Sequence, residues 1–356
     1  MPGGGLFLFI AFGLLPGTFW RLLGRKSWNV HRAGFAAALA AYVLSTPSLR
    51  PNAETLRNIS KNWNLALLGF CLSFTQPLWG GLRLHRLLGD VGRIEITCAQ
   101  SVALCFSGFF FNIFLPGATG GDAYRVYVLG RQGGAGIGSA IATISLDRFL
   151  GLPSLVLIVF FGMALDWRYL ANNRTLSEMV PFIAAAGGIC LLLIGYLVLA
   201  GKGRRQADKI APGEADDTRS AGRLLRLHRL LAKNVRRPAT LPLALLYGAL
   251  AHVATIAACQ CFGSSLGISG ISWMRYYLIV PMALSINVIP VAPGGVGQGE
   301  LAMAALFAMA SSDGANAQAG VMLMLLFRLS NIAIGLSGAV AYVAGWRRCG
   351  WKATWP

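Results

Sequence analysis

The chain has 356 residues, of which 55% are hydrophobic and only 12% are charged. Soluble domains of this length carry about 25% charged residues, so the composition excludes an ordinary water-soluble protein and predicts an all-α, polytopic helical membrane protein. The formal net charge is +18, but the basic residues stand between apolar runs. This distribution favours positive-inside topology and contact with anionic headgroups, and we expect no nucleic-acid binding.

Apolar runs of roughly 20 residues can cross a bilayer as helices, and by this measure we predict about eight to ten membrane segments. In chain order the predicted segments are 5–23, 33–46, 63–82, 94–115, 137–165, 179–200, 239–262, 273–292, 296–312 and 316–346. The first segment lacks the basic start and cleavage site of a signal peptide, so we treat it as a membrane segment. Residues 1–346 are therefore expected to form a single membrane domain.

One long polar stretch, residues 201–237, is rich in Lys and Arg. Its second half, GRLLRLHRLLAKNVRR, places leucines on one helical face and arginines on the other, which is typical of an amphipathic helix at the membrane interface. The positive-inside rule then predicts that this loop and the tail, residues 347–356, are cytoplasmic.

A weak internal repeat is the most informative feature of the sequence. The first copy reads FFNIFLPGATGGDAYR and the second reads SINVIPVAPGGVGQGE. In each copy an apolar stretch ends at an asparagine and is followed by Pro-Gly, further glycines and a carboxylate. An apolar segment with one arginine follows each copy at similar spacing, with Arg148 in the first and Arg328 in the second. We predict two repeat units, at about 94–165 and 273–346.

The Pro-Gly stretches should interrupt helices within the membrane. Such breaks persist only where protein or a water-filled cavity lines them, and paired breaks in two halves indicate a transport site at the repeat interface. If the loops 83–93 and 201–237 are both cytoplasmic, the two units run in opposite directions, which predicts an inverted repeat with re-entrant segments. The alternative is that Pro-Gly marks ordinary loops. The predicted helix-break positions are Pro116, Gly117, Gly120, Gly121, Pro293, Gly294, Gly295 and Gly297.

Charged side chains inside apolar segments cost at least about 2.5–3.5 kcal/mol each at mid-bilayer, so each needs a partner or water. Asp122 and Arg125 would share one face of a helix, whereas the adjacent Asp147 and Arg148 should reach separate partners. We expect a polar cavity in which arginines attract an anionic phosphate while carboxylates neutralise them. The alternative is a set of structural ion pairs that hold helices together. The predicted translocation residues are Asn112, Asp122, Arg125, Asp147, Arg148, Glu300 and Arg328.

Three blocks, NIFLPGATGGDAYRVYVL, SLDRFLGL and IPVAPGGVGQGE, resemble in order and spacing the flippase-like family of lysylphosphatidylglycerol synthase transmembrane domains. The resemblance covers roughly residues 60–346. It implies that the protein moves or presents lipids, such as phospholipids, hopanoid-type lipids or polyprenyl-phosphate-linked intermediates, across a bacterial inner membrane. Bifunctional members of the family also carry a soluble aminoacyltransferase domain. Because this chain ends ten residues after Trp346, we expect no aminoacyl transfer.

The leading hypothesis is a flippase for an anionic lipid, with membrane lipids as its partners and no catalytic residues. Two alternatives remain: a membrane-embedded lipid-phosphate transferase, and a non-transporting scaffold for a lipid-modifying enzyme or a glycosyltransferase. The sequence has no GxxxxGK[ST] phosphate loop, and its cysteines show no metal-ligand spacing. We therefore expect no cofactor and no metal.

Overall fold

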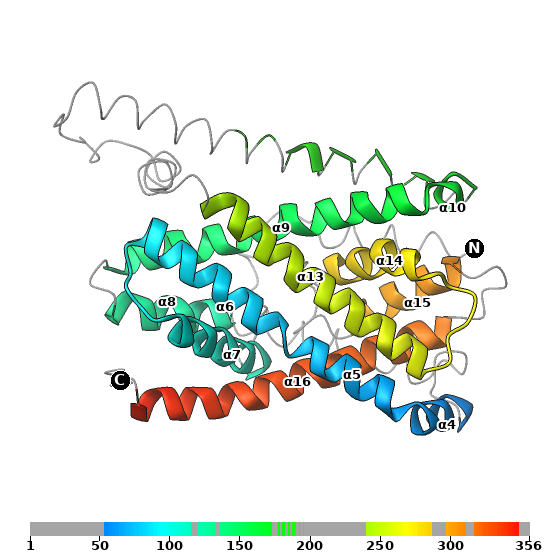
Figure 1. Ribbon diagram of the computed structural model, residues 1–356, viewed down its shortest axis with the longest axis horizontal. Coiled ribbons are helices and arrows are strands. Elements are labelled where there is room, and N and C mark those ends of the chain that lie inside the picture. Colours follow the sequence, from blue (N-terminus) through cyan, green and yellow to red (C-terminus); the bar gives the residue numbers. More distant parts are fainter. Residues whose placement is uncertain are drawn as a thin grey trace, which may run out of the picture. The chain divides into compact units, whose positions relative to one another are not determined.

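The computed structural model describes residues 53–114, 120–132, 136–172, parts of 177–195, 240–286, 297–310 and 317–348 (Figure 1). All regular secondary structure in these residues is helical. The helices are α4 (Ala53–Lys61), α5 (Trp63–Ser73), α6 (Gln76–Leu87), the π-helical turn η2 (Leu88–Gly92), α7 (Cys98–Phe114), α8 (Gly120–Gln132), α9 (Gly136–Leu165), α10 (Trp167–Asn172), α13 (Thr240–Ser265), α14 (Trp273–Ile286), α15 (Gln298–Ala310) and α16 (Ala317–Arg348). The predicted segments 5–23 and 33–46, the basic loop 201–237 and the tail beyond Arg348 lie outside the described residues.

Four of the described stretches are helices long and apolar enough to cross a membrane: Trp63–Gly92, Gly136–Leu165, Thr240–Ser265 and Ala317–Val343. Two shorter apolar helices are Cys98–Asn112 and Gln298–Ala310. These helices coincide with predicted segments and confirm the polytopic helical membrane protein. The total of eight to ten membrane segments stays a prediction.

The predicted loop at residues 83–93 is wrong, because α6 and η2 continue through it as far as Gly92. The basic residues lower the hydropathy here, yet apolar side chains recur at the helical spacing i, i+3, i+4 and i+7. All four are buried: Leu84, Leu87, Leu88 and Val91. The helix ends at Arg93, whose φ of 54° places it in the left-handed region.

The described helices form two compact units. Of the described residues, unit 1 comprises those within 1–73, 111–120 and 256–333, and unit 2 comprises those within 74–110, 121–255 and 334–356. Among the described helices, α4, α5, α14 and α15 belong to unit 1, whereas α6, η2, α9 and α10 belong to unit 2. The division falls inside α7, α8, α13 and α16, so each of these helices contributes to both units.

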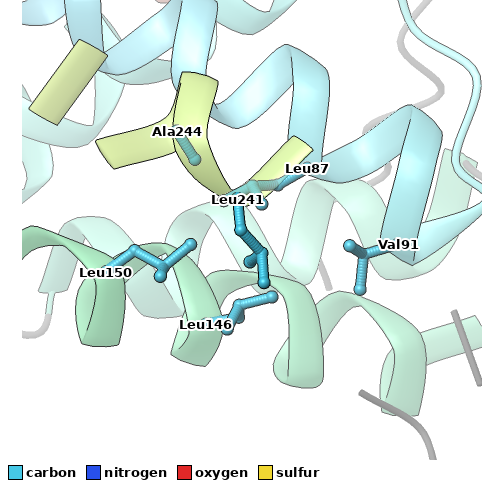
Figure 2. Packing of buried hydrophobic residues seen from close by; sticks show 6 residues of the cluster. All are labelled: Leu87, Val91, Leu146, Leu150, Leu241 and Ala244. Atoms are coloured by element: carbon cyan, nitrogen blue, oxygen red, sulfur yellow. The ribbon is translucent and has the colours of Figure 1, made fainter. Parts of the chain in front are cut away.

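The core of unit 2 joins α6, η2, α9 and the first part of α13 (Figure 2). Its buried side chains are Leu87, Val91, Leu146, Leu150, Leu241 and Ala244. Leu146 and Leu150 are one helical turn apart and therefore face the same side of α9. This packing holds α6 against α9, so polar residues beside the core on these two helices can reach each other.

In unit 1, close helix packing depends on a glycine of α16. A Cβ atom added at Gly320 would lie 2.6 Å from the backbone oxygen of Met303 in α15, closer than real side chains come. Small residues of this kind let membrane helices approach backbone to backbone. Beside this contact, Ala304 of α15 and Val321 of α16 are buried together. The short distance between the two helices allows an arginine on α16 to reach the start of α15.

Candidate functional site

In the described part of both copies of the sequence repeat, a carboxylate stands in the first turn of a short helix. Asp122 is the third residue of the 13-residue helix α8, and Glu300 is the third residue of the 13-residue helix α15. A carboxylate in the first turn interacts favourably with the backbone N–H groups that a helix leaves unpaired at its N-terminus. Each copy therefore places one negative charge near the start of a short helix, with Asp122 in unit 2 and Glu300 in unit 1.

In unit 1, Glu300 forms a bidentate ion pair with Arg328 of α16. The Nε of Arg328 donates to Oε1 of Glu300, and Nη2 donates to Oε2 at 3.0 Å. Oε2 also accepts the backbone N–H of Gly297 at 2.8 Å, as in half of a capping box. Gly297 has a φ of +82°, which residues with a side chain rarely adopt. The Glu300 carboxylate is thus fully engaged at the start of its helix.

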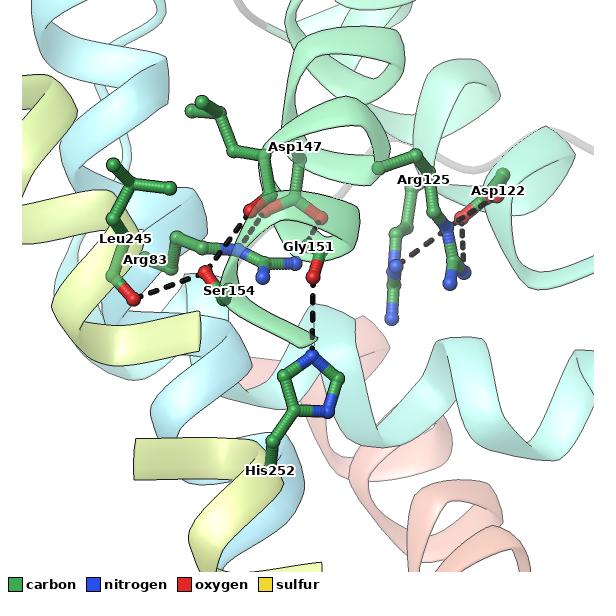
Figure 3. Close-up of polar contacts among 10 residues, drawn as sticks. Arg83, Asp122, Arg125, Asp147, Gly151, Ser154, Leu245 and His252 are labelled. Atoms are coloured by element: carbon green, nitrogen blue, oxygen red, sulfur yellow. Dashed lines mark hydrogen bonds and ion pairs between the residues drawn. The ribbon is translucent and has the colours of Figure 1, made fainter. Parts of the chain in front are cut away.

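In unit 2, Asp122 forms the equivalent bidentate pair with Arg148 of α9. The Nε of Arg148 donates to Oδ2 and its Nη2 donates to Oδ1, both at 2.7 Å. Arg125, one turn along α8, donates from Nη1 to the same Oδ1 at 3.2 Å (Figure 3). The Arg148 side chain is 50% exposed, whereas that of Arg125 is 6% exposed. One carboxylate is therefore shared by a buried and a half-exposed arginine.

A second ion pair of unit 2 joins Asp147 of α9 to Arg83 of α6 (Figure 3). The Nε of Arg83 donates to Oδ1 at 2.6 Å and Nη2 donates to Oδ2 at 3.0 Å. Only 13% of the Arg83 side chain and 4% of the Asp147 side chain are exposed. Glycines make room for the guanidinium, since a Cβ atom at Gly248 would lie 3.2 Å from its Nη1.

Further polar contacts hold α9 to α13 beside this pair (Figure 3). The Ser154 hydroxyl donates to the backbone oxygen of Leu245 at 3.1 Å. Nε2 of His252 lies 3.1 Å from the backbone oxygen of Gly151. Inside a bilayer such contacts satisfy polar groups that water does not reach. These contacts hold α9 and α13 together beside the ion pair of Asp147 and Arg83.

Comparisons with known proteins bear on this geometry. A family model described as the lysylphosphatidylglycerol synthase TM region matches residues 29–338. The chain belongs to this family. The UPF0104 membrane protein PH1989 of Pyrococcus horikoshii is 25% identical over an alignment of 259 residues, and the match covers 68% of this chain and 75% of that protein. No solved structure gives a significant match. Membership in the lysylphosphatidylglycerol synthase TM family supports a lipid-related role in a membrane.

For this member of the lysylphosphatidylglycerol synthase TM family, several predicted contacts are confirmed. Asp122 and Arg125 do share a helical face. Asp147 and Arg148 do reach separate partners. Arg83 belongs to the candidate site but was not predicted from the sequence. Its charge lowers the local hydropathy, so residues 83–93 were predicted to form a loop. The buried apolar stripe around it was the signal that this stretch is helical.

Other predicted positions are described only in part. Asn112 lies half-buried near the end of α7. Gly120 and Gly121 begin α8, and Gly297 directly precedes α15. Outside the described residues lie Pro116, Gly117, Pro293, Gly294 and Gly295. Arg148 belongs to unit 2 and Arg328 to unit 1, so their meeting in one cavity stays a prediction.

Proposed function

We propose that this protein is a flippase, which moves a lipid with an anionic headgroup across a bacterial inner membrane. The observation that carries the proposal is the ion pair formed twice, Asp122 with Arg148 and Glu300 with Arg328. In each case a carboxylate at the start of a short helix binds an arginine of the next long helix. Family membership adds the link to lipids.

Guanidinium groups are suited to binding an anionic headgroup because they bind phosphate with the same bidentate geometry that they use for carboxylates. A headgroup phosphate can therefore take the place of Asp122 or Glu300 on its arginine. The released carboxylate then compensates a neighbouring charge or is hydrated. Such an exchange lets a charged headgroup pass the apolar region while the acyl chains stay in the bilayer.

The proposal includes an inverted relation between the two sequence repeats, at about 94–165 and 273–346. Transporters built from inverted repeats bind substrate near the bilayer midplane, where interrupted helices of both repeats meet. In that arrangement each repeat would offer its own arginine to the headgroup, Arg148 in the first and Arg328 in the second. Cysteines introduced at Arg168 and Arg275 test this topology, since both should react with an impermeant thiol reagent only from the periplasmic side.

Transport itself is measured in proteoliposomes with a fluorescent phosphatidylglycerol and a quencher confined to the outside. Arg148→Gln removes a half-exposed guanidinium and should lower the initial rate at least tenfold, as expected when a charge-assisted contact of about 1.5–3 kcal/mol is lost. Arg86→Gln removes the same charge from an exposed position on α6 and should leave the rate unchanged. Equal rates for wild type and Arg148→Gln would contradict the proposal.

A purely structural role for the ion pairs makes a different prediction. The double substitution Glu300→Gln/Arg328→Gln replaces both charges by amides that can hydrogen-bond to each other. If the pair only joins α15 to α16, this double variant should transport as well as wild type. If the pair binds the headgroup, the variant should fold and remain inactive. If the protein is instead a non-transporting scaffold, the wild-type protein should move no lipid in this assay.

A further inference from the structure

The two ion-pair sites differ in their charge balance. In unit 1, the pair formed by the described residues Glu300 and Arg328 holds one charge of each sign. In unit 2, as far as the described residues go, the three guanidinium groups of Arg83, Arg125 and Arg148 face the two carboxylates of Asp122 and Asp147. We refer to these five residues of unit 2 as the arginine cluster. Among the described residues of its two pairs, the cluster therefore carries one positive charge in excess.

The excess charge belongs to the group around Asp122. Arg83 and Asp147 form a complete bidentate pair, and among the described residues Asp122 is the carboxylate that accepts hydrogen bonds from both Arg125 and Arg148. Its two oxygens are occupied by Arg148 at 2.7 Å, which leaves Arg125 with one longer bond. A buried cation with a shared counter-charge is unfavourable unless another anion approaches.

The contacts of Arg125 with the described residues show directly that its guanidinium is short of acceptors. The residue is 5% exposed, and its Nε is buried without a hydrogen-bond partner. Its Nη2 reaches a backbone oxygen, that of Cys105, only at 3.5 Å. The guanidinium lies against Gly108 of α7, where an added Cβ would be 2.7 Å from Nε. Gly108 thus leaves the space that Arg125 occupies, and the helix packing keeps an under-satisfied cation in place.

We propose that the arginine cluster binds the phosphodiester of one lipid headgroup, with Arg148 as the contacting residue and Arg125 as the positioning residue. Arg148 is the half-exposed member, so an incoming anion meets it first. When phosphate oxygens take the Nε and Nη2 donors of Arg148, Asp122 is free to pair with Arg125. The single excess charge then equals the single negative charge of a phosphodiester. This inference rests on the proposed function and locates its headgroup site in unit 2.

Net charge distinguishes an anionic phosphodiester headgroup from phosphomonoester and zwitterionic headgroups. A phosphodiester carries one negative charge, whereas a phosphomonoester carries about −1.5 to −2 at pH 7. A zwitterionic headgroup brings its own cation, which the cluster repels. The cluster should therefore prefer phosphatidylglycerol to phosphatidate and to phosphatidylcholine.

The test is retention of lipid by the full-length protein. Protein in nanodiscs with equal parts phosphatidylglycerol, phosphatidate and phosphatidylcholine is transferred to mild detergent, and bound lipids are counted by native mass spectrometry. Wild type should retain about one phosphatidylglycerol, with at least a tenfold preference over each other lipid. Millimolar inorganic phosphate should not displace it. Displacement would assign the site to free phosphate and overturn a lipid site.

Two substitutions probe the two arginines. Arg148→Gln should abolish the preference by removing the contacting donors. Gly108→Ala should reduce it by displacing the Arg125 guanidinium, while Gly138→Ala is the matched control because a Cβ there meets nothing within 4 Å. Thermal transitions of all variants establish that they are folded. An unchanged preference in folded Arg148→Gln, or equal retention of all three lipids by wild type, overturns the inference.

The transport assay separates this inference from the proposed function. Selective retention in a protein that does not move lipid would overturn the flippase and leave the headgroup site. Transport by wild type without selective retention would overturn the headgroup site and leave the flippase.

Discussion

Replacing Asp147 by asparagine should destabilise the protein strongly. The substitution leaves Arg83, of which 13% of the side chain is exposed, beside a neutral amide. At a charge separation of about 4 Å and an effective dielectric constant near 20, the lost attraction is about 4 kcal/mol. Measured losses for breaking a buried pair on one side are about 3–5 kcal/mol. We therefore expect the free energy of unfolding to fall by about 3–4 kcal/mol.

A double-mutant cycle separates the interaction from the burial of the charges. Arg83→Gln alone should also destabilise, whereas Arg83→Gln/Asp147→Asn should recover at least about half of either loss, since no uncompensated charge remains. Unfolding is followed by circular dichroism during titration of mixed micelles with SDS. Glu95→Gln is the control, because this carboxylate is exposed and its loss should change stability by less than about 0.5 kcal/mol. A coupling energy near zero would refute the reasoning.

Three further substitutions test the helix packing and the helix ends by the same unfolding measurement. Gly338→Ala would drive a Cβ into the backbone oxygen of Phe106 and should cost at least about 2 kcal/mol, whereas Gly138→Ala should cost nothing. Gly297→Ala should cost about 1–2 kcal/mol, because the left-handed φ of +82° strains any side chain. Thr97→Ala removes the side-chain half of a complete capping box at the start of α7 and should cost about 1 kcal/mol. Losses below about 0.3 kcal/mol at these positions would contradict the packing and cap geometry.

Contacts set by helical periodicity could be predicted from the sequence. Asp122 and Arg125 are three residues apart, so any helix through them brings their side chains together. Asp147 and Arg148 are adjacent, so a helix directs them to different neighbours. These relations depend only on local backbone geometry, and the structure contains both.

The partner of Asp147 could not be predicted in this way. Arg83 is 64 residues away, and the contact exists because α6 and α9 pack through the core of unit 2. The space around the arginines could not be predicted from the sequence either. Gly108 looks like one of many membrane glycines until the structure places it against the Arg125 guanidinium. Both features arise from packing between helices that are distant in sequence.

Both repeats contain an ion pair between a carboxylate and an arginine, but the two carboxylates differ in how readily they can exchange their arginine. Glu300 is held by Arg328 and by the backbone of Gly297, so it should leave its arginine less readily than Asp122 does. Asp122 is shared by two arginines, one of them half-exposed, and can shift between them. Glu300→Gln should therefore lower stability and transport together, whereas Arg148→Gln should lower transport with little loss of stability. Parallel measurement of SDS unfolding and lipid movement distinguishes these outcomes, and a large stability loss in Arg148→Gln would place that arginine among the structural pairs.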